Sequence, residues 1–109
     1  MFEVEVSNAF SISRRGTVLV GRVKRGRVQA GDSALLKTPT VEIATHVTGI
    51  EVARKILGVA SEGEEAGFLC HSIQPEHLAA CFVGEGGERR LENVLLASTP
   101  RRWWEFWRE

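Results

Sequence analysis

Residues 17–23, TVLVGRV, form the stretch that decides the fold. Four of its seven residues, Thr17, Val18, Val20 and Val23, are β-branched, a composition that favours a strand over a helix. The following residues 24–27, KRGR, contain a glycine and predict a turn. We therefore expect a central β-strand that ends at this turn.

Further strand patterns lie on both sides of this stretch. Phe2, Val4 and Val6 alternate with glutamates, which is the period of a half-buried strand. Gly49 interrupts a long β-branched stretch and predicts a bulge or a barrel corner. The remaining apolar stretches occupy residues 34–36, 41–52, 54–57, 67–73 and 91–97. Many short strands separated by glycine turns are typical of a small antiparallel barrel.

Residues 74–88 break this series of strands. Pro75 suits the first turn of a helix, and Leu78 and Phe82 lie four residues apart, on one face of a helix. The pattern predicts a short helical insertion before a last strand at residues 91–97.

The length and charge of the chain limit its function. A chain of 109 residues is one domain, and 14 basic residues balance 14 acidic residues. Because its net charge is zero, the molecule as a whole is not attracted to a phosphate backbone, so any RNA contact requires a local binding patch on its surface. The sequence shows no secretory signal and no apolar run long enough to span a bilayer, and we expect a cytoplasmic protein.

A metal site is the first alternative that the sequence raises. Cys70, His71, His77 and Cys81 lie within twelve residues of one another. Cys70 and His71 are adjacent on an expected strand and point to opposite faces, so one metal ion could take only one of them. Structural zinc sites need four ligands. We therefore expect no metal and no cofactor, and no catalytic Cys–His pair.

Four ordered motifs resemble domain 2 of elongation factor Tu and related translational GTPases. They are residues 9–26, AFSISRRGTVLVGRVKRG, residues 30–32, AGD, residues 48–55, TGIEVARK, and residues 63–67, GEEAG. The resemblance covers about residues 2–98. It implies an all-β fold, a six-stranded antiparallel barrel over residues 1–98. Residues 99–109 lie beyond the resemblance and are expected to form a separate Trp-rich C-terminal tail.

The resemblance also implies a pocket for the 3′-terminal adenosine of tRNA. The matching residues are two apolar walls, an acid that contacts adenine and ribose, a base that contacts the backbone and an apolar floor: Ile12, Val18, Glu51, Arg54 and Leu69. Four positions depart from the family pattern: Ser7, Arg14, Val20 and Glu65. A competing interpretation is an exposed ion pair, Glu51 with Arg54, beside a core formed by the three apolar residues.

The resemblance does not extend to catalysis. The phosphate-binding loop of a GTPase needs the pattern GxxxxGK[ST], which is missing from this sequence. We expect a stand-alone domain that is not an enzyme, with a GTPase supplied by another protein as one conceivable partner.

The C-terminal tail holds all three tryptophans of the chain. Pro100 precedes the sequence RRWWEFWRE, and the candidate docking residues are Arg101, Arg102, Trp103, Trp104, Phe106 and Trp107. Tryptophan and arginine are the residues most enriched at interface hot spots. The tail could instead cap the barrel or lie on a lipid surface, although nine residues offer little area for a membrane.

Two functions therefore compete. The first is a protein-interaction adaptor that binds a partner through residues 101–109. The second is a translation accessory that binds the acceptor end of tRNA, the ribosome or a GTPase in trans.

Overall fold

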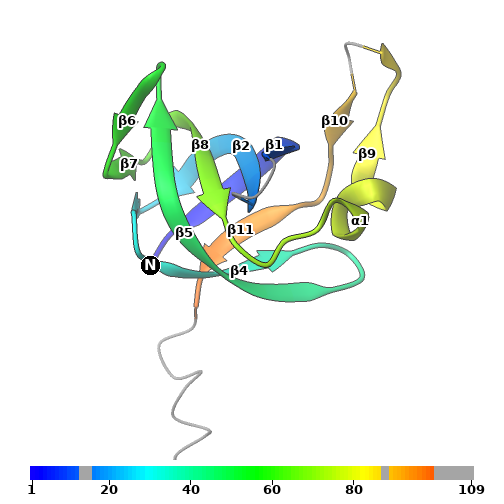
Figure 1. Ribbon diagram of the computed structural model, residues 1–109, viewed down its shortest axis with the longest axis horizontal. Coiled ribbons are helices and arrows are strands. Elements are labelled where there is room, and N and C mark those ends of the chain that lie inside the picture. The colour runs from blue at the N-terminus through cyan, green and yellow to red at the C-terminus, as the bar shows by residue number, and fades with distance from the viewer. Residues whose placement is uncertain (13–15, 87–88, 100–109) are drawn as a thin grey trace, which may run out of the picture.

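The computed structural model describes residues 1–12, 16–86 and 89–99, and it places the 17–23 stretch inside a ten-residue strand. This strand is β2 (Gly16–Arg25), and it follows β1 (Glu3–Ile12) (Figure 1). The remaining strands are β3 (Arg27–Gln29), β4 (Ser33–Lys37), β5 (Glu42–Val52), β6 (Lys55–Leu57), β7 (Val59–Ser61), β8 (Glu65–Cys70), β9 (Phe82–Val83), β10 (Arg90–Leu91) and β11 (Leu95–Ser98).

Six of these strands close into an antiparallel ring. The main sheet has the order β4-β11-β1-β2-β8-β5-β6, and an additional pairing of β4 with β5 joins its ends. The ring therefore consists of β4, β11, β1, β2, β8 and β5, while β6 extends β5 outward. The predicted six-stranded antiparallel architecture is confirmed. Gly49 lies at a register shift in the pairing of β5 with β8, as its position within the strand predicts.

The core fills the ring, and each of its six strands contributes a fully buried side chain. These residues are Val4, Leu19, Leu36, Val47, Phe68 and Leu96. In β1, β2 and β8 the alternation sends every second side chain inward and leaves the others on the outer face. In β4 three consecutive residues, Ala34, Leu35 and Leu36, are buried.

The insertion after β8 differs in part from the prediction. A helix does form, as α1 (Pro75–Leu78) followed by the 3-10 turn η1 (Ala79–Cys81), but it ends before Phe82, which lies in β9. Leu78 and Phe82 therefore do not share a helical face. Leu91 belongs to β10 rather than to the last strand, which begins at Leu95.

β9 and β10 pair with each other and form an arm, defined as residues 82–91, that projects beside the ring (Figure 1). The base of this arm is anchored in the core by three buried residues, Leu78, Leu91 and Val94. Asn93 takes a positive φ of 61° and ends the apolar run that the sequence suggested was one strand. No helix in the described part of the chain is long and apolar enough to cross a membrane.

Two buried threonines fix the chain where it leaves β8 for the insertion. The Thr17 hydroxyl donates to the carbonyl oxygen of Ile73 at 2.7 Å. The Thr45 hydroxyl donates to the carbonyl oxygen of His71. Because both carbonyls are held by side chains of the ring, the insertion starts from a defined position.

Candidate functional site

The outer face of β1, β2, β8 and β5 collects the residues that the sequence singled out. In β2, Leu19 points into the core, so its neighbours Val18 and Val20 point outward. In β8, Phe68 points inward, and Gly67 and Leu69 therefore lie on the outer face.

Strand register arranges these residues in two rows. Phe10 pairs with Val18, Val18 with Leu69, and Leu69 with Gly49, which gives one row across four strands. The second row runs through Asn8, Val20, Gly67 and Glu51. An apolar row thus lies beside a row that ends in a carboxylate.

A shallow depression of about 230 Å³ lies over these rows. Its lining consists of Phe10, Val18, Val20, Glu51, Ala53, Arg54, Glu65, Ala66 and Gly67. The missing side chain of Gly67 keeps it open, since a Cβ there would lie 3.2 Å from Cγ1 of Val18. The surface combines an apolar wall, including a 52% exposed Phe10, with ionisable groups at one side.

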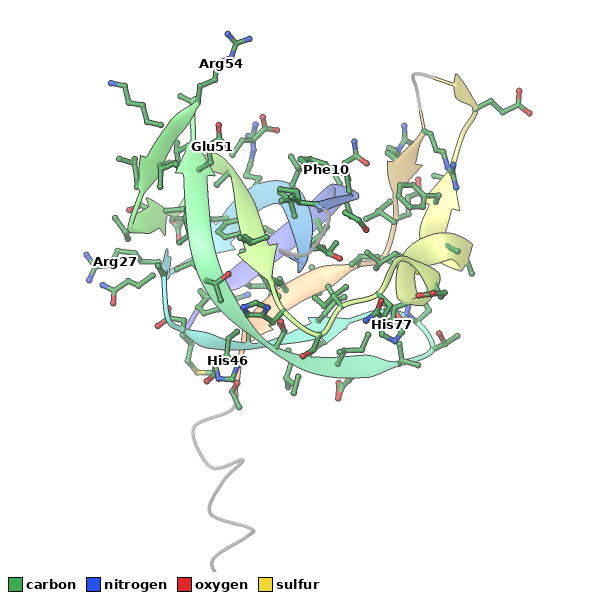
Figure 2. All side chains as sticks on the ribbon, viewed as in Figure 1. Phe10, Arg27, His46, Glu51, Arg54 and His77 are labelled. Atoms are coloured by element: carbon green, nitrogen blue, oxygen red, sulfur yellow. The ribbon has the colours of Figure 1, made fainter. Side chains whose placement is uncertain are left out.

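Arg54 reaches this depression from the turn between β5 and β6. Val52 pairs with Lys55, so Ala53 and Arg54 are the two central residues of a tight hairpin turn. Their φ angles are 50° and 66°, the left-handed pair that a type I′ turn requires. Figure 2 shows Arg54 at the tip of this hairpin, with Glu51 below it on β5 and Phe10 on β1, across β8 and β2.

Three of the five predicted pocket residues, Val18, Glu51 and Arg54, line the depression. Leu69 lies next to Val18 on the same face, and Ile12, 36% exposed, lies at the end of β1 opposite Gly16. The five residues therefore share one surface, although Ile12 and Leu69 stand outside the lining.

The competing interpretation of these residues is wrong in both of its parts. Ile12, Val18 and Leu69 lie outside the buried core. The ion pairs among the described residues are Arg22–Glu65, Lys24–Glu5 and Arg90–Glu92, and none of them joins Glu51 to Arg54.

Three of the four departures from the family pattern lie at or near the depression. Glu65 lies in its lining, and its carboxylate is 3.8 Å from the guanidinium of Arg22. The Ser7 hydroxyl donates to the carbonyl oxygen of Val20 at 3.2 Å, across β1 and β2. Arg14 lies outside the described residues.

Phe10 is a lining residue that the sequence reasoning left out. The available signal was its position two residues before Ile12 on one strand, which places both side chains on one face. The sequence reasoning also left out Ala53, because nothing in the sequence indicates that this alanine adopts a left-handed backbone conformation.

The cysteines and histidines of the rejected metal cluster have other surroundings. Cys70 is fully buried in the core, and burial raises the pKa of its thiol to about 12. The Nδ1 atom of His77 accepts the backbone N–H of Gln74 at 3.0 Å, next to the start of α1. Across residues 1–12, 16–86 and 89–99, no group of three or more acidic, histidine or cysteine side chains could hold a metal ion.

The predicted docking residues Arg101, Arg102, Trp103, Trp104, Phe106 and Trp107 lie outside the described residues. The separate tail at residues 99–109 and its role in binding stay predictions.

Comparison with known proteins agrees with this fold. Residues 16–83 match the family model of elongation factor Tu domain 2. The crystal structure of translation elongation factor SelB from Methanococcus maripaludis, in its apo form, superposes with a TM-score of 0.71 at 22% sequence identity. The match covers 93% of this chain and 19% of the SelB chain. At this identity the superposition shows the fold alone.

Proposed function

The chain belongs to the elongation factor Tu domain 2 family, and from this premise we propose that it is a non-catalytic binding domain of translation that holds the end of an RNA strand. The observation that carries this proposal is the depression on the outer face, where Val18 and Phe10 lie beside Glu51 and Arg54. The family relation supports a role in translation, and the depression supports a site for one terminal nucleotide.

Each part of a terminal nucleotide has a counterpart in the depression. Phe10, Val18 and Val20 offer an apolar surface on which a base stacks without being identified. The Glu51 carboxylate accepts a hydrogen bond from a ribose hydroxyl, which distinguishes RNA from DNA. The Arg54 guanidinium, at the exposed hairpin tip, pairs with a phosphate.

The electrostatics of the site predict weak dependence on salt. The chain has a net charge of zero, and Glu65 in the lining lies beside Arg22, so Arg54 is left as the cation for a phosphate. Each phosphate neutralised on a single strand contributes a slope of about −0.7 in log K against log salt. We expect a slope of about −0.7, much shallower than that of a basic RNA-binding surface with several phosphate contacts.

The test is the affinity of the full chain for deacylated tRNA, measured by fluorescence anisotropy. Replacing Glu51 and Arg54 by alanine removes both polar contacts and lowers affinity by roughly tenfold or more. The matched control is the double change Lys37→Ala with Glu42→Ala, which removes the same charges from a cross-strand pair of β4 and β5. Equal affinity in the two double variants would exclude this depression as the RNA site.

A second candidate function is that of an adaptor that binds a protein through residues 101–109. Its support is the sequence, which gathers three tryptophans and two arginines, Arg101 and Arg102, within seven residues. Its partner is a protein of the cytoplasm. Deleting residues 101–109 should abolish capture of a ribonuclease-resistant partner while tRNA affinity is retained. Capture that persists after the deletion would exclude the tail as the docking element.

A further inference from the structure

Glu65 is the second carboxylate of the depression. It belongs to the lining together with Glu51, and the two residues lie on neighbouring strands, β8 and β5. Gly67 pairs with Glu51, and Glu65 comes two residues before Gly67, so its side chain points to the same outer face. Diagonal neighbours of this kind lie roughly 7–8 Å apart. The depression therefore has two negative charges close together at one side.

Arg22 pairs with Glu65 from outside the lining. The two residues are cross-strand partners of β2 and β8, and Nη2 of Arg22 lies 3.8 Å from Oε1 of Glu65, with both side chains more than half exposed. Arg54, in contrast, lines the depression and stands above Glu51 (Figure 2). Arg54 joins none of the ion pairs formed by residues 1–12, 16–86 and 89–99. It is therefore the lining residue that remains to meet a phosphate, while Arg22 is committed to Glu65.

These charges limit the phosphates that the depression accepts. The terminal ribose at a 3′ end carries two neighbouring hydroxyl groups, and the Glu51 carboxylate has two oxygens that accept from them. The phosphate that links this nucleotide to the preceding one pairs with Arg54. A further phosphate on the terminal ribose would bring its negative charge beside Glu51 and Glu65. Among the lining residues that the structure describes, no second cation stands ready to pair with it.

We propose that Glu65, paired with Arg22, makes the depression selective for an RNA end with a free 3′-hydroxyl group and excludes an end with a 3′-phosphate. This inference rests on the proposed function and names the class of RNA end that the same depression accepts. Glu65 is one of the departures from the family pattern, so we expect the selectivity of this chain rather than of the family. Because both carboxylates of the depression are exposed, solvent weakens the repulsion to a preference of roughly tenfold.

The experiment titrates the ¹⁵N-labelled full chain with three forms of the RNA tetranucleotide AAAA and follows the amide signals of Gly67 and Val20. The first RNA has hydroxyl groups at both ends, the second has a 3′-phosphate and the third has a 5′-phosphate. The second and third carry the same charge and differ only in the end that holds the phosphate. We expect the 3′-phosphate to raise the dissociation constant roughly tenfold and the 5′-phosphate to change it by less than about twofold. Equal dissociation constants for the second and third RNA would overturn the proposal.

Glu65→Gln tests the role of the carboxylate. The change removes a negative charge from the lining and releases Arg22, so the preference for the free 3′-hydroxyl should fall to about threefold or less. The matched control is Glu5→Gln, which releases Lys24 from a comparable exposed ion pair of 3.6 Å that lies outside the depression. This control makes the same change in net charge and should keep the native preference. A preference that survives Glu65→Gln, or that falls equally in both variants, would contradict the assignment to Glu65.

The same spectra separate this inference from the proposed function. Shifts at Gly67 and Val20 that are lost in the double variant Glu51→Ala with Arg54→Ala place the RNA in the depression, whichever end is preferred. If the RNA with free hydroxyl groups shifts other residues instead, or binds the double variant equally well, the proposed function fails and the selectivity fails with it. If that RNA binds in the depression and the 3′-phosphate makes no difference, the selectivity alone is wrong.

Discussion

Gly21 of β2 lies directly against the backbone of Glu5 in β1. A Cβ at residue 21 would overlap the carbonyl oxygen of Glu5 and lie 3.0 Å from the Cα of Val6. The register of β1 on β2 shifts just beyond this point, between Val6 and Asn8. The close approach at Gly21 therefore lies next to the bulge that precedes the part of β1 carrying the candidate site.

Replacing Gly21 by alanine should destabilise the ring. The overlap is with backbone atoms, which cannot move aside as a flexible side chain can, so we expect a loss of about 1–3 kcal/mol. For a domain of this size each kcal/mol lowers the melting temperature by roughly 4–8 °C. Gly58→Ala is the matched control, since nothing lies within 4 Å of a Cβ there. Equal melting temperatures for the two variants, measured by circular dichroism, would contradict this account.

Replacing Thr17 by valine should destabilise the junction between the ring and the insertion. The change keeps the shape of the side chain but leaves the buried carbonyl oxygen of Ile73 without its donor, at a cost of about 1–3 kcal/mol. Thr48→Val provides the control, because its hydroxyl donates to the carbonyl oxygen of Leu69 at an exposed position. Urea unfolding of both variants measures the difference. A Thr48→Val variant as destabilised as Thr17→Val would show that burial of the bond is unimportant.

The ring was predictable because its strands alternate in a way that no helix would. Val4, Leu19 and Phe68 each occupy the inward position that the period of two assigns. The resemblance to the family then predicted that the strands close into a ring, which alternation alone does not specify. The resemblance, and not alternation, singled out Val18 and Glu51, which the structure places in the lining of the depression.

The insertion was less predictable because its apolar residues serve two different elements. Leu91 and Val94 are both buried, so an apolar run through them reads as one strand. The break at Asn93 depends on one left-handed residue, and asparagine in a sequence only permits that conformation. Phe82 likewise fits a helical spacing with Leu78 but pairs with Leu91 in the arm. Long-range packing decided both cases.

Stability should fall at alkaline pH because of Cys70. Burial raises the pKa of its thiol from 9.0 to about 12, so the folded state keeps the proton while the unfolded state loses it. The contribution is complete below about pH 9 and is lost as pH rises from 9 to 12, by up to about 1.4 kcal/mol per pH unit. We expect the free energy of unfolding of the native chain to approach that of Cys70→Ala over this range. A constant difference from pH 8 to pH 11 would contradict the assignment, and Cys81→Ala should retain the slope.

Replacing the turn residues Ala53 and Arg54 should raise the stability of the fold and weaken RNA binding. Type I′ turns favour Asn-Gly, whereas Ala53 and Arg54 adopt φ angles of 50° and 66° at a cost of order 1 kcal/mol each. Changing both residues to Asn-Gly should therefore raise stability by about 1–2 kcal/mol and lower tRNA affinity, because the guanidinium is removed. Ala53→Asn alone should stabilise the hairpin and lower affinity less than the Asn-Gly change does, since Arg54 keeps its place at the depression. Thermal melting and tRNA anisotropy on the same samples separate the two effects. If the Asn-Gly variant kept full tRNA affinity, Arg54 would not be part of the site. If the variant were no more stable than the native chain, the turn would not be strained.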